Sequence, residues 1–257
     1  MQIKEWEIAD FTISGAHSIA SDGDVYVVDN TGYHEVVVLD NDFKFKQRFK
    51  NIGERPHKVI YDDFTNAFYV IATPSIYCFK KDSEGYLYLD YQKELSFMTG
   101  GYVRSIRIID GLMYFVSGRS KIVVTNYRDK SYSILNEYTA PDELAGMNDI
   151  AKVGNFFYLT ATQNVEGDIA PMIVRTYDLS RLMSGNYEDL YNVLGFKNTP
   201  YFISVFDNKV FITEIGTESN GIYSFEIEDV NLSNIEKVFK FGAPDSESVK
   251  RRDIFPL

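Results

Sequence analysis

The sequence places two of its three histidines at the same point of a repeated pattern. Five short segments each lead into a strand-like run, and they can be aligned on the isoleucine or valine that ends each segment. Two positions before that residue stand His17, His57, Arg104, Asn148 and Tyr201. Imidazole has an ordinary pKa of about 6.5, so paired histidines can exchange protons near neutral pH or ligate a metal.

The aligned residues differ in chemistry, which suits a pocket that recognises an asymmetric ligand. We expect His17 and His57 to serve as general base or metal ligand and Tyr201 as proton donor, so these three are the candidate catalytic residues. Arg104 keeps its charge and presents five fixed donors, which fit a carboxylate or phosphate. Asn148 can bond the hydroxyl groups of a ligand.

A second set of aligned residues follows the aromatic residue at the centre of the next strand by three positions. In an antiparallel hairpin, the end of the second strand lies at the same edge as the start of the first. Carboxylates at that edge can exchange protons or bind a hard cation, so a divalent metal is left open as a cofactor. The set is Asp29, Ala72, Ser117, Ala161 and Glu214, and Arg119 and Gln163, two residues further along, are candidate rim contacts.

Each of these residues also has a structural interpretation. The histidines could bond neighbouring backbone, and Arg104 could form a salt bridge, with Asp149 as a candidate partner. Asp29 could brace a turn, and for His34, which follows a Thr-Gly-Tyr turn, we expect a structural role.

The elements that must position these residues are short strands. Branched and aromatic runs such as 24–28, 35–39, 112–116 and 155–159 favour strands, and Gly- or Asn-containing turns separate them. A more polar fourth strand, such as 43–49 or 237–241, closes most units, and 180–183 is the one expected helical turn. Four antiparallel strands that recur every 40–53 residues or so are typical of a β-propeller.

We therefore predict a single all-β domain over residues 1–257, a β-propeller with four-stranded blades. Five first-strand segments indicate five blades, although the length divided by a typical blade leaves six open. We expect Lys4–Phe11 to close the last blade as an added strand, and Lys250–Leu257 to pack across a face or fray.

The first predicted blade carries a more detailed pattern. Residues 17–40 combine a small-residue start, a glycine turn, the strand Tyr26–Asp29, the turn Thr31–His34 and an apolar strand that ends in Asp40. This pattern resembles an NHL repeat. The resemblance implies a propeller fold and not a particular chemistry, because such propellers include scaffolds, binding modules and enzymes.

Composition limits the class of partner. Lys+Arg 26 against Asp+Glu 37 gives a formal net charge of −11, which opposes binding to nucleic acid or to anionic membrane surfaces. The single cysteine, Cys78, offers no internal disulfide and no zinc cluster. With neither a signal-peptide pattern nor a long apolar run, we expect a soluble, cytoplasmic protein.

The function that we expect is an axial polar pocket for a small anionic or sugar-like ligand, and a lyase, isomerase or hydrolase would suit its residues. The sequence leaves open whether the site is catalytic. A protein-interaction scaffold is the alternative, followed by a glycan-binding module, and Tyr86, Tyr88 and Tyr91 are the aromatic residues that a partner or sugar could contact.

Overall fold

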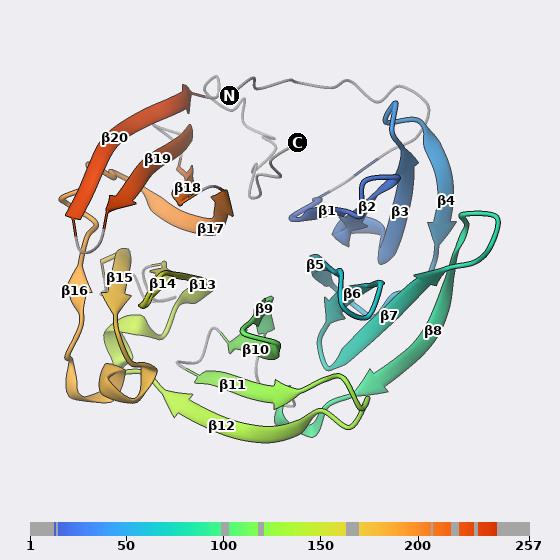
Figure 1. Ribbon diagram of the computed structural model, residues 1–257, viewed down its shortest axis with the longest axis horizontal. Coiled ribbons are helices and arrows are strands. Elements are labelled where there is room, and N and C mark those ends of the chain that lie inside the picture. Colours follow the sequence, from blue (N-terminus) through green and yellow to red (C-terminus); the bar gives the residue numbers. More distant parts are fainter. Residues whose placement is uncertain are drawn as a thin grey trace. The chain divides into compact units, whose positions relative to one another are not determined.

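The residues that the structure describes form an all-β fold of five four-stranded antiparallel sheets, which follow one another in sequence (Figure 1). The computed structural model describes residue 13 and residues 15–98, 103–117, 121–162, 170–206, 208–216, 221–228 and 231–240. Each sheet is one blade of a β-propeller fold, which confirms the predicted class and the prediction of five blades.

In every sheet the strands are ordered as they occur in the chain. The first two sheets consist of β1 (Ile19–Ser21), β2 (Val25–Asn30), β3 (Glu35–Asp40) and β4 (Phe45–Phe49), and of β5 (Pro56–Asp62), β6 (Ala67–Ala72), β7 (Ser75–Lys81) and β8 (Leu87–Glu94). The third consists of β9 (Val103–Ile109), β10 (Leu112–Ser117), β11 (Lys121–Asn126) and β12 (Ser133–Thr139). The last two consist of β13 (Met147–Val153), β14 (Phe156–Ala161), β15 (Met172–Thr176) and β16 (Glu188–Asp189), and of β17 (Thr199–Phe206), β18 (Lys209–Ile215), β19 (Gly221–Glu228) and β20 (Asn231–Lys240).

Four short 3-10 helices occur among the described residues: η1 (Thr31–Tyr33), η2 (Ser96–Met98), η3 (Asp142–Leu144) and η4 (Leu179–Ser184). The last contains the predicted helical turn at 180–183 and confirms it. The strands predicted at 24–28, 35–39 and 112–116 are also present, as β2, β3 and β10. The expected closing strand at 4–11 and the segment 250–257 lie outside the described residues. In the part of the chain that the structure describes, no helix has the length and apolar character needed to cross a bilayer.

The chain divides into two compact units, residues 1–106 and residues 107–257, and the division falls within β9. The first unit contains two complete sheets, in which β1 and β5 lie side by side (Figure 1). In the second unit, β13 and β17 are neighbours in the same way. The prediction of a single domain stays a prediction.

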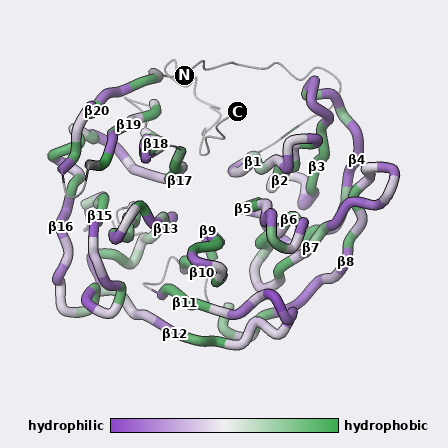
Figure 2. The backbone as a smooth tube through the Cα atoms, in the orientation of Figure 1, coloured by the Kyte–Doolittle hydropathy of each residue, from purple (hydrophilic) through white to green (hydrophobic). Residues whose placement is uncertain are grey.

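Burial follows the order of the strands within each sheet. The second and third strands are almost wholly buried, for example β6 and β7, because their branched and aromatic side chains pack against neighbouring sheets. The fourth strand β12 is largely exposed, and β4 and β8 are exposed or half-buried along most of their length. Figure 2 shows many hydrophilic residues along β4 and β8. The first strands β5 and β13 are themselves buried along most of their length, so polar side chains on them lie in a packed environment.

Apolar cores fill the spaces between successive sheets within each unit. In the first unit, Val27 and Val38 belong to the same buried cluster as Phe68 and Phe79 of the next sheet. In the second unit, one cluster joins the third and fourth sheets and another joins the fourth and fifth. Burial of these side chains supplies the main stabilisation, since each large apolar residue contributes about 1.5–3 kcal/mol.

Polar links also join the first strands of neighbouring sheets, and sequence reasoning missed them. Ser18 Oγ donates to the carbonyl of Val59 (3.2 Å) and accepts from its amide (3.1 Å). At the aligned position of the fourth sheet, Asp149 Oδ2 accepts from the amide of Ile203 (2.9 Å). In the first and fourth sheets, the residue after the predicted ring position is therefore a connector to the next sheet.

Asp149 is the centre of a buried ionic link. Its side chain is fully buried, and it accepts from Nε of Arg107 at 2.9 Å and also pairs with Nη2 of that residue, which donates in addition to the carbonyl of Ile203. The sequence suggested Asp149 as a salt-bridge partner of Arg104. Within the second unit, the arginine that pairs with Asp149 is Arg107. One carboxylate thus ties three successive sheets together.

Asp149→Asn should destabilise the protein by about 3 kcal/mol, because it leaves the Arg107 guanidinium partly buried without its counter-charge. Urea unfolding followed by circular dichroism measures the change. The matched control is Glu137→Gln, which removes the exposed pair with Lys121 and should cost less than about 1 kcal/mol. Equal losses for both variants would contradict the assigned role of Asp149.

Candidate functional site

In the second, fourth and fifth sheets, the start of the first strand and the end of the second strand meet at the same edge, as predicted. Pro56 pairs with Ala72, Met147 with Ala161, and Pro200 with Glu214. Each first member of these pairs immediately precedes a predicted ring residue. The two aligned sets therefore occupy one edge within the second, fourth and fifth sheets.

Three of the ring residues lie at irregularities in the strand pairing. The register shifts between Pro56 and Lys58, between Met147 and Asp149, and between Pro200 and Ile203. Extra residues on one strand bend it locally and change the direction of a side chain, which is why such bulges accompany functional sites. The bulged residues include His57, Asn148 and Tyr201. An alignment of residue types cannot reveal these shifts.

In the first sheet, the side chain of an aspartate accepts hydrogen bonds from backbone amides at this edge. The strand β1 begins only at Ile19, and the preceding amides of His17 and Ser18 donate to the Asp29 carboxylate at 2.9 and 2.5 Å. Asp29 in turn donates its own amide to the carbonyl of Ser18 at 3.2 Å. The bracing role considered for Asp29 is therefore present, and its carboxylate fixes the backbone that carries His17.

The His17 ring is oriented by a second contact to the same network. Its Nδ1 lies 2.8 Å from Oγ1 of Thr31 and 3.3 Å from Oδ2 of Asp29. Two acceptors lie within hydrogen-bond reach of Oγ1 of Thr31: Asp29 Oδ2, at 2.9 Å, and the carbonyl of Pro56. A hydroxyl has one proton, and a carbonyl only accepts, so the best-satisfied arrangement directs that proton to Asp29 or Pro56. Nδ1 of His17 is then the donor to Thr31, and Nε2 carries the lone pair of the neutral ring.

The two predicted histidines are brought into direct contact within the first unit. The ring centroids of His17 and His57 are 4.2 Å apart, with 49° between the ring planes. Exposed fractions are 9% for His17 and 1% for His57, so both rings are shielded from solvent while His17 keeps some access to it. Two groups that can titrate near neutral pH therefore share one buried environment.

Asp29 is itself fully buried. Burial raises the pKa of its carboxyl above the ordinary value, and the hydrogen bonds from His17, Ser18 and Thr31 act in the opposite direction. A buried carboxylate of this kind gains from a cation beside it, and the His17 imidazole can supply that charge when it is protonated.

The corresponding residues of the second unit make backbone contacts. Asn148 is fully buried, and its amide donates to the carbonyl of Pro200 at 2.9 Å. Tyr201 is 8% exposed, its ring lies edge-on to that of Phe202, and its carbonyl accepts from Thr160. Ligand roles for Asn148 and Tyr201 stay predictions, and the contact of Asn148 links the fourth and fifth sheets.

Glu214 braces the chain that leads into β17. Its Oε1 accepts from the amides of Lys197 (2.8 Å) and Asn198 (3.0 Å), and its Oε2 pairs with Lys237 at 2.8 Å. Burial acts to raise the pKa of Glu214, but the hydrogen bonds from Lys237, Lys197 and Asn198 outweigh it, so the pKa lies below its ordinary value. Glu214 and Asp29 therefore perform the same task in different units: each caps amides before a first strand.

The remaining predicted residues lie in other environments or outside the described part of the chain. Arg104 is half-buried at the start of β9, and Arg119 and Gln163 lie outside the described residues. His34 lies in a turn in the left-handed conformation (φ 56°), with its Nδ1 3.2 Å from the carbonyl of Gly53. Among the residues that are described, no group of three or more His, Cys, Asp or Glu side chains is placed to hold a metal ion.

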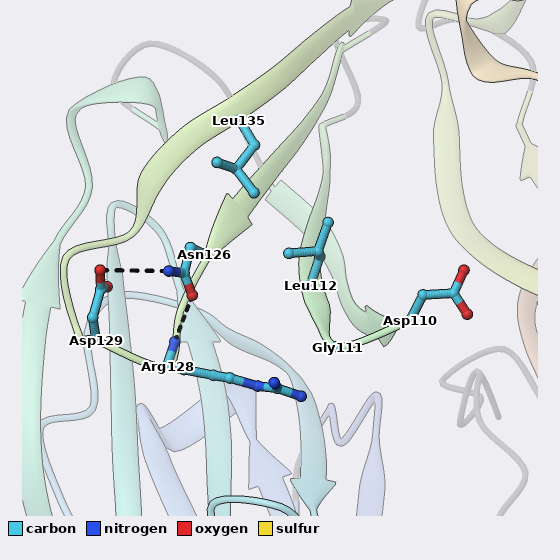
Figure 3. A pocket seen from close by; sticks show the side chains of 7 residues that line it. All are labelled: Asp110, Gly111, Leu112, Asn126, Arg128, Asp129 and Leu135. Atoms are coloured by element: carbon cyan, nitrogen blue, oxygen red, sulfur yellow. Dashed lines mark hydrogen bonds between the residues drawn. The ribbon is translucent and has the colours of Figure 1, made fainter.

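A shallow surface pocket lies elsewhere, at the hairpin ends of the third sheet. Figure 3 shows the Arg128 side chain reaching toward Gly111, while the amide of Arg128 donates to Asn126 at 3.3 Å. Asp110, beside it, is paired with Lys152 at 2.5 Å. The pocket is open and its charged groups take part in turn contacts, so it presents no convergent set of catalytic groups. It is lined by Asp110, Gly111, Leu112, Asn126, Arg128, Asp129 and Leu135.

Comparison with known proteins supports the fold. No protein-family model matches the sequence, and the search of curated proteins finds no match. Among solved structures, a protein from Lactobacillus plantarum is 13% identical with a TM-score of 0.60, over 91% of this chain and 73% of that one. Streptogramin B lyase is 18% identical with a TM-score of 0.56, over 87% and 72%. The β-propeller domain of Cps50 (Swd1) from Myceliophteria thermophila is 9% identical with a TM-score of 0.55, over 87% and 72%.

These similarities are to proteins of low sequence identity and therefore concern the fold alone. Together with the five sheets, they define the chain as a β-propeller protein.

Glu214→Gln should lower stability at pH 7 by about 2 kcal/mol, since it weakens charge-assisted bonds to two amides and a lysine. A carboxyl whose pKa is lowered on folding contributes stability above its ordinary value of 4.5, and that contribution is lost as the pH falls through the folded-state pKa. Thermal unfolding should thus separate wild type from variant at pH 7 and much less at pH 3.

The matched control is Glu236→Gln, which removes an exposed partner of Lys209 in the same sheet. This variant should unfold close to wild type at both pH values. A Glu214→Gln deficit that persists undiminished at pH 3 would contradict the assignment.

Proposed function

We propose that the first unit binds a small polar ligand at the His17–His57 pair and that Nε2 of His17 exchanges a proton with it. The observation that carries the proposal is the 4.2 Å contact between two buried imidazoles from neighbouring sheets, one of them oriented by Thr31 and Asp29. Apolar residues would be enough for core packing at these positions. Two buried imidazoles instead need hydrogen-bond partners that replace the water they lose.

The contacts of His17 suit acid–base chemistry. A general base needs a fixed tautomer with the lone pair on the nitrogen that faces the ligand. The donor contact from Nδ1 to Thr31, backed by the buried Asp29, provides that tautomer and compensates the charge when Nε2 is protonated. The same logic underlies histidine–carboxylate pairs in hydrolases, where the acid orients the ring.

The position of the pair in the fold also favours a binding site. His57 lies at a bulge, which directs its side chain out of the regular ladder, and His17 precedes the first residue of β1. Arg104 occupies the aligned position of the next sheet within the same unit and is our candidate for an anionic group of the ligand. One of the similar propeller structures is named as a lyase, so this fold is compatible with catalysis.

We further propose that the first sheet is an NHL-type repeat. Its turn forms the short helix η1 at Thr31–Tyr33, followed by His34 in the left-handed conformation, and Asp29 before the turn is the buried brace. In this interpretation the repeat motif supplies the two residues, Asp29 and Thr31, that orient His17.

A scaffold role is the second candidate function, and a specific observation favours it. Phe45 of β4 and Tyr86 and Tyr88 near or on β8 are each 45% exposed in the same unit. Exposed aromatic side chains are enriched at protein interfaces. If this role is the main one, substituting these three residues by serine should remove a partner while leaving small-ligand binding at the histidines intact.

The chain has only three histidines, which makes the proposed site directly observable. Proton–carbon correlation spectra of the imidazole rings should be recorded while acetate, phosphate and glucose are added in turn. We expect at least one of these probes to shift the His17 and His57 signals saturably while His34, in its exposed turn, stays unchanged. Signals that move for none of the probes, or equally for all three histidines, would contradict the proposal.

Thr31→Val should weaken ligand binding about fivefold to tenfold, because it removes the acceptor that orients Nδ1 of His17 and a net hydrogen bond contributes about 1 kcal/mol. The matched control is Thr65→Val, which removes a hydroxyl bonded to Asp62 in the second sheet of the same unit. The control should bind like wild type. Equal losses in both variants would point to general destabilisation and against a positioning role for Thr31.

A further inference from the structure

The two histidine rings that touch come from different sheets. His17 precedes β1 and His57 lies in β5, and the described strand pairings join β1 to β2 and β5 to β6. Each of these backbone ladders fixes the chain within its own sheet. The 4.2 Å distance between the ring centroids therefore depends on contacts that run from one sheet to the next.

Ser18, the residue after His17, makes such contacts in both directions. Toward the first sheet, its amide donates to Oδ1 of Asp29 at 2.5 Å, and its carbonyl accepts from the amide of Asp29 at 3.2 Å. Toward the second sheet, its Oγ donates to the carbonyl of Val59 at 3.2 Å and accepts from the amide of Val59 at 3.1 Å. One serine thus connects the buried Asp29 carboxylate with the strand β5.

The part of β5 that Ser18 holds is the part that carries His57. Val59 follows His57 by two residues, and Pro56 precedes it, with its carbonyl within hydrogen-bond reach of Oγ1 of Thr31. The backbone on both sides of His57 is therefore tied to the first sheet. The register of β5 against β6 shifts at this point, so the ladder within the second sheet is irregular where these two contacts act.

We infer that Ser18 is a positioning residue, whose hydroxyl holds the backbone of His57 at the distance that brings the two imidazoles together for the ligand. The inference rests on the proposed function and adds to it the residue that sets the geometry of the pair. Ser18 acts through the two rings and is assigned no contact with the ligand.

Burial makes this hydroxyl difficult to replace. Ser18 is 3% exposed and Val59 is 1% exposed. Without the hydroxyl, the amide and the carbonyl of Val59 would each lose a partner in a region shielded from solvent, which is costly unless the backbone moves toward new partners. Such a movement displaces His57, two residues away, and separates its ring from that of His17.

The contact between the rings can be measured on the full chain without any ligand. In the wild type, ring centroids 4.2 Å apart should give a strong nuclear Overhauser effect between the carbon-bound ring protons of His17 and His57. Ser18→Ala should lose most of this signal. The rings of Phe196 and Tyr223, stacked with centroids 4.1 Å apart in the second unit, are the internal reference, and their signal should be unchanged.

Binding is measured on the same proteins with acetate, phosphate and glucose as probes. Each probe that binds the wild type should bind Ser18→Ala about tenfold more weakly, since the loss of one well-placed contact costs about that much. The matched control is Ser75→Ala, which removes a buried hydroxyl that accepts from Gln92 between β7 and β8 of the same unit. The control should change neither the ring signal nor the binding.

A second variant covers the case in which Ser18→Ala does not fold, which loss of both ring signals would reveal. Ser18→Cys keeps a side chain of similar size that is a weaker donor and acceptor, so it should give an intermediate loss of ring contact and of affinity.

The outcomes separate this inference from the proposed function. A folded Ser18→Ala or Ser18→Cys variant with the ring signal of the wild type would overturn the inference and leave the proposed site intact. A lost ring signal with unchanged probe binding would also overturn it, because the hydroxyl would then have a structural role alone. If no probe perturbs His17 or His57 in the wild type, the proposed function fails and the inference fails with it.

Discussion

The first sheet depends on one buried carboxylate. Asp29 accepts from the amides of His17 and Ser18 just before β1 begins, and through Thr31 it also sets the orientation of the His17 ring. Without this carboxylate, two backbone donors would be buried without partners, which is among the most costly defects that a fold can contain. Backbone geometry and the chemistry of the histidine are therefore fixed by the same group.

Other sheets meet the same constraint with different residues. Glu214 caps the amides before β17, and Asp149 joins Arg107 to the backbone of the next first strand. In these sheets, the buried acids hold backbone amides and basic side chains in place. What distinguishes the first sheet is that the bonded acid also contacts an imidazole, which in turn contacts a second one from the neighbouring sheet.

Much of the fold could be predicted from the sequence, because branched and aromatic runs separated by glycine turns define strands locally. The alignment of His17 with His57 also placed two rings that do meet. The bulges at His57, Asn148 and Tyr201, and the connectors Ser18 and Asp149, could not be predicted, since they depend on pairing between strands. Arg107 was missed for the same reason: it lies three residues after Arg104, and only tertiary packing brings it to Asp149.

The tautomer of His17 tests the central claim most directly. Long-range proton–nitrogen correlation spectra at pH 8.5 report which ring nitrogen is protonated in each of the three histidines. The account predicts a proton on Nδ1 of His17 and an unprotonated Nε2, with Thr31→Val loosening this preference. A proton fixed on Nε2 in the wild type would contradict it, because the lone pair would then face Thr31 and could not serve a ligand.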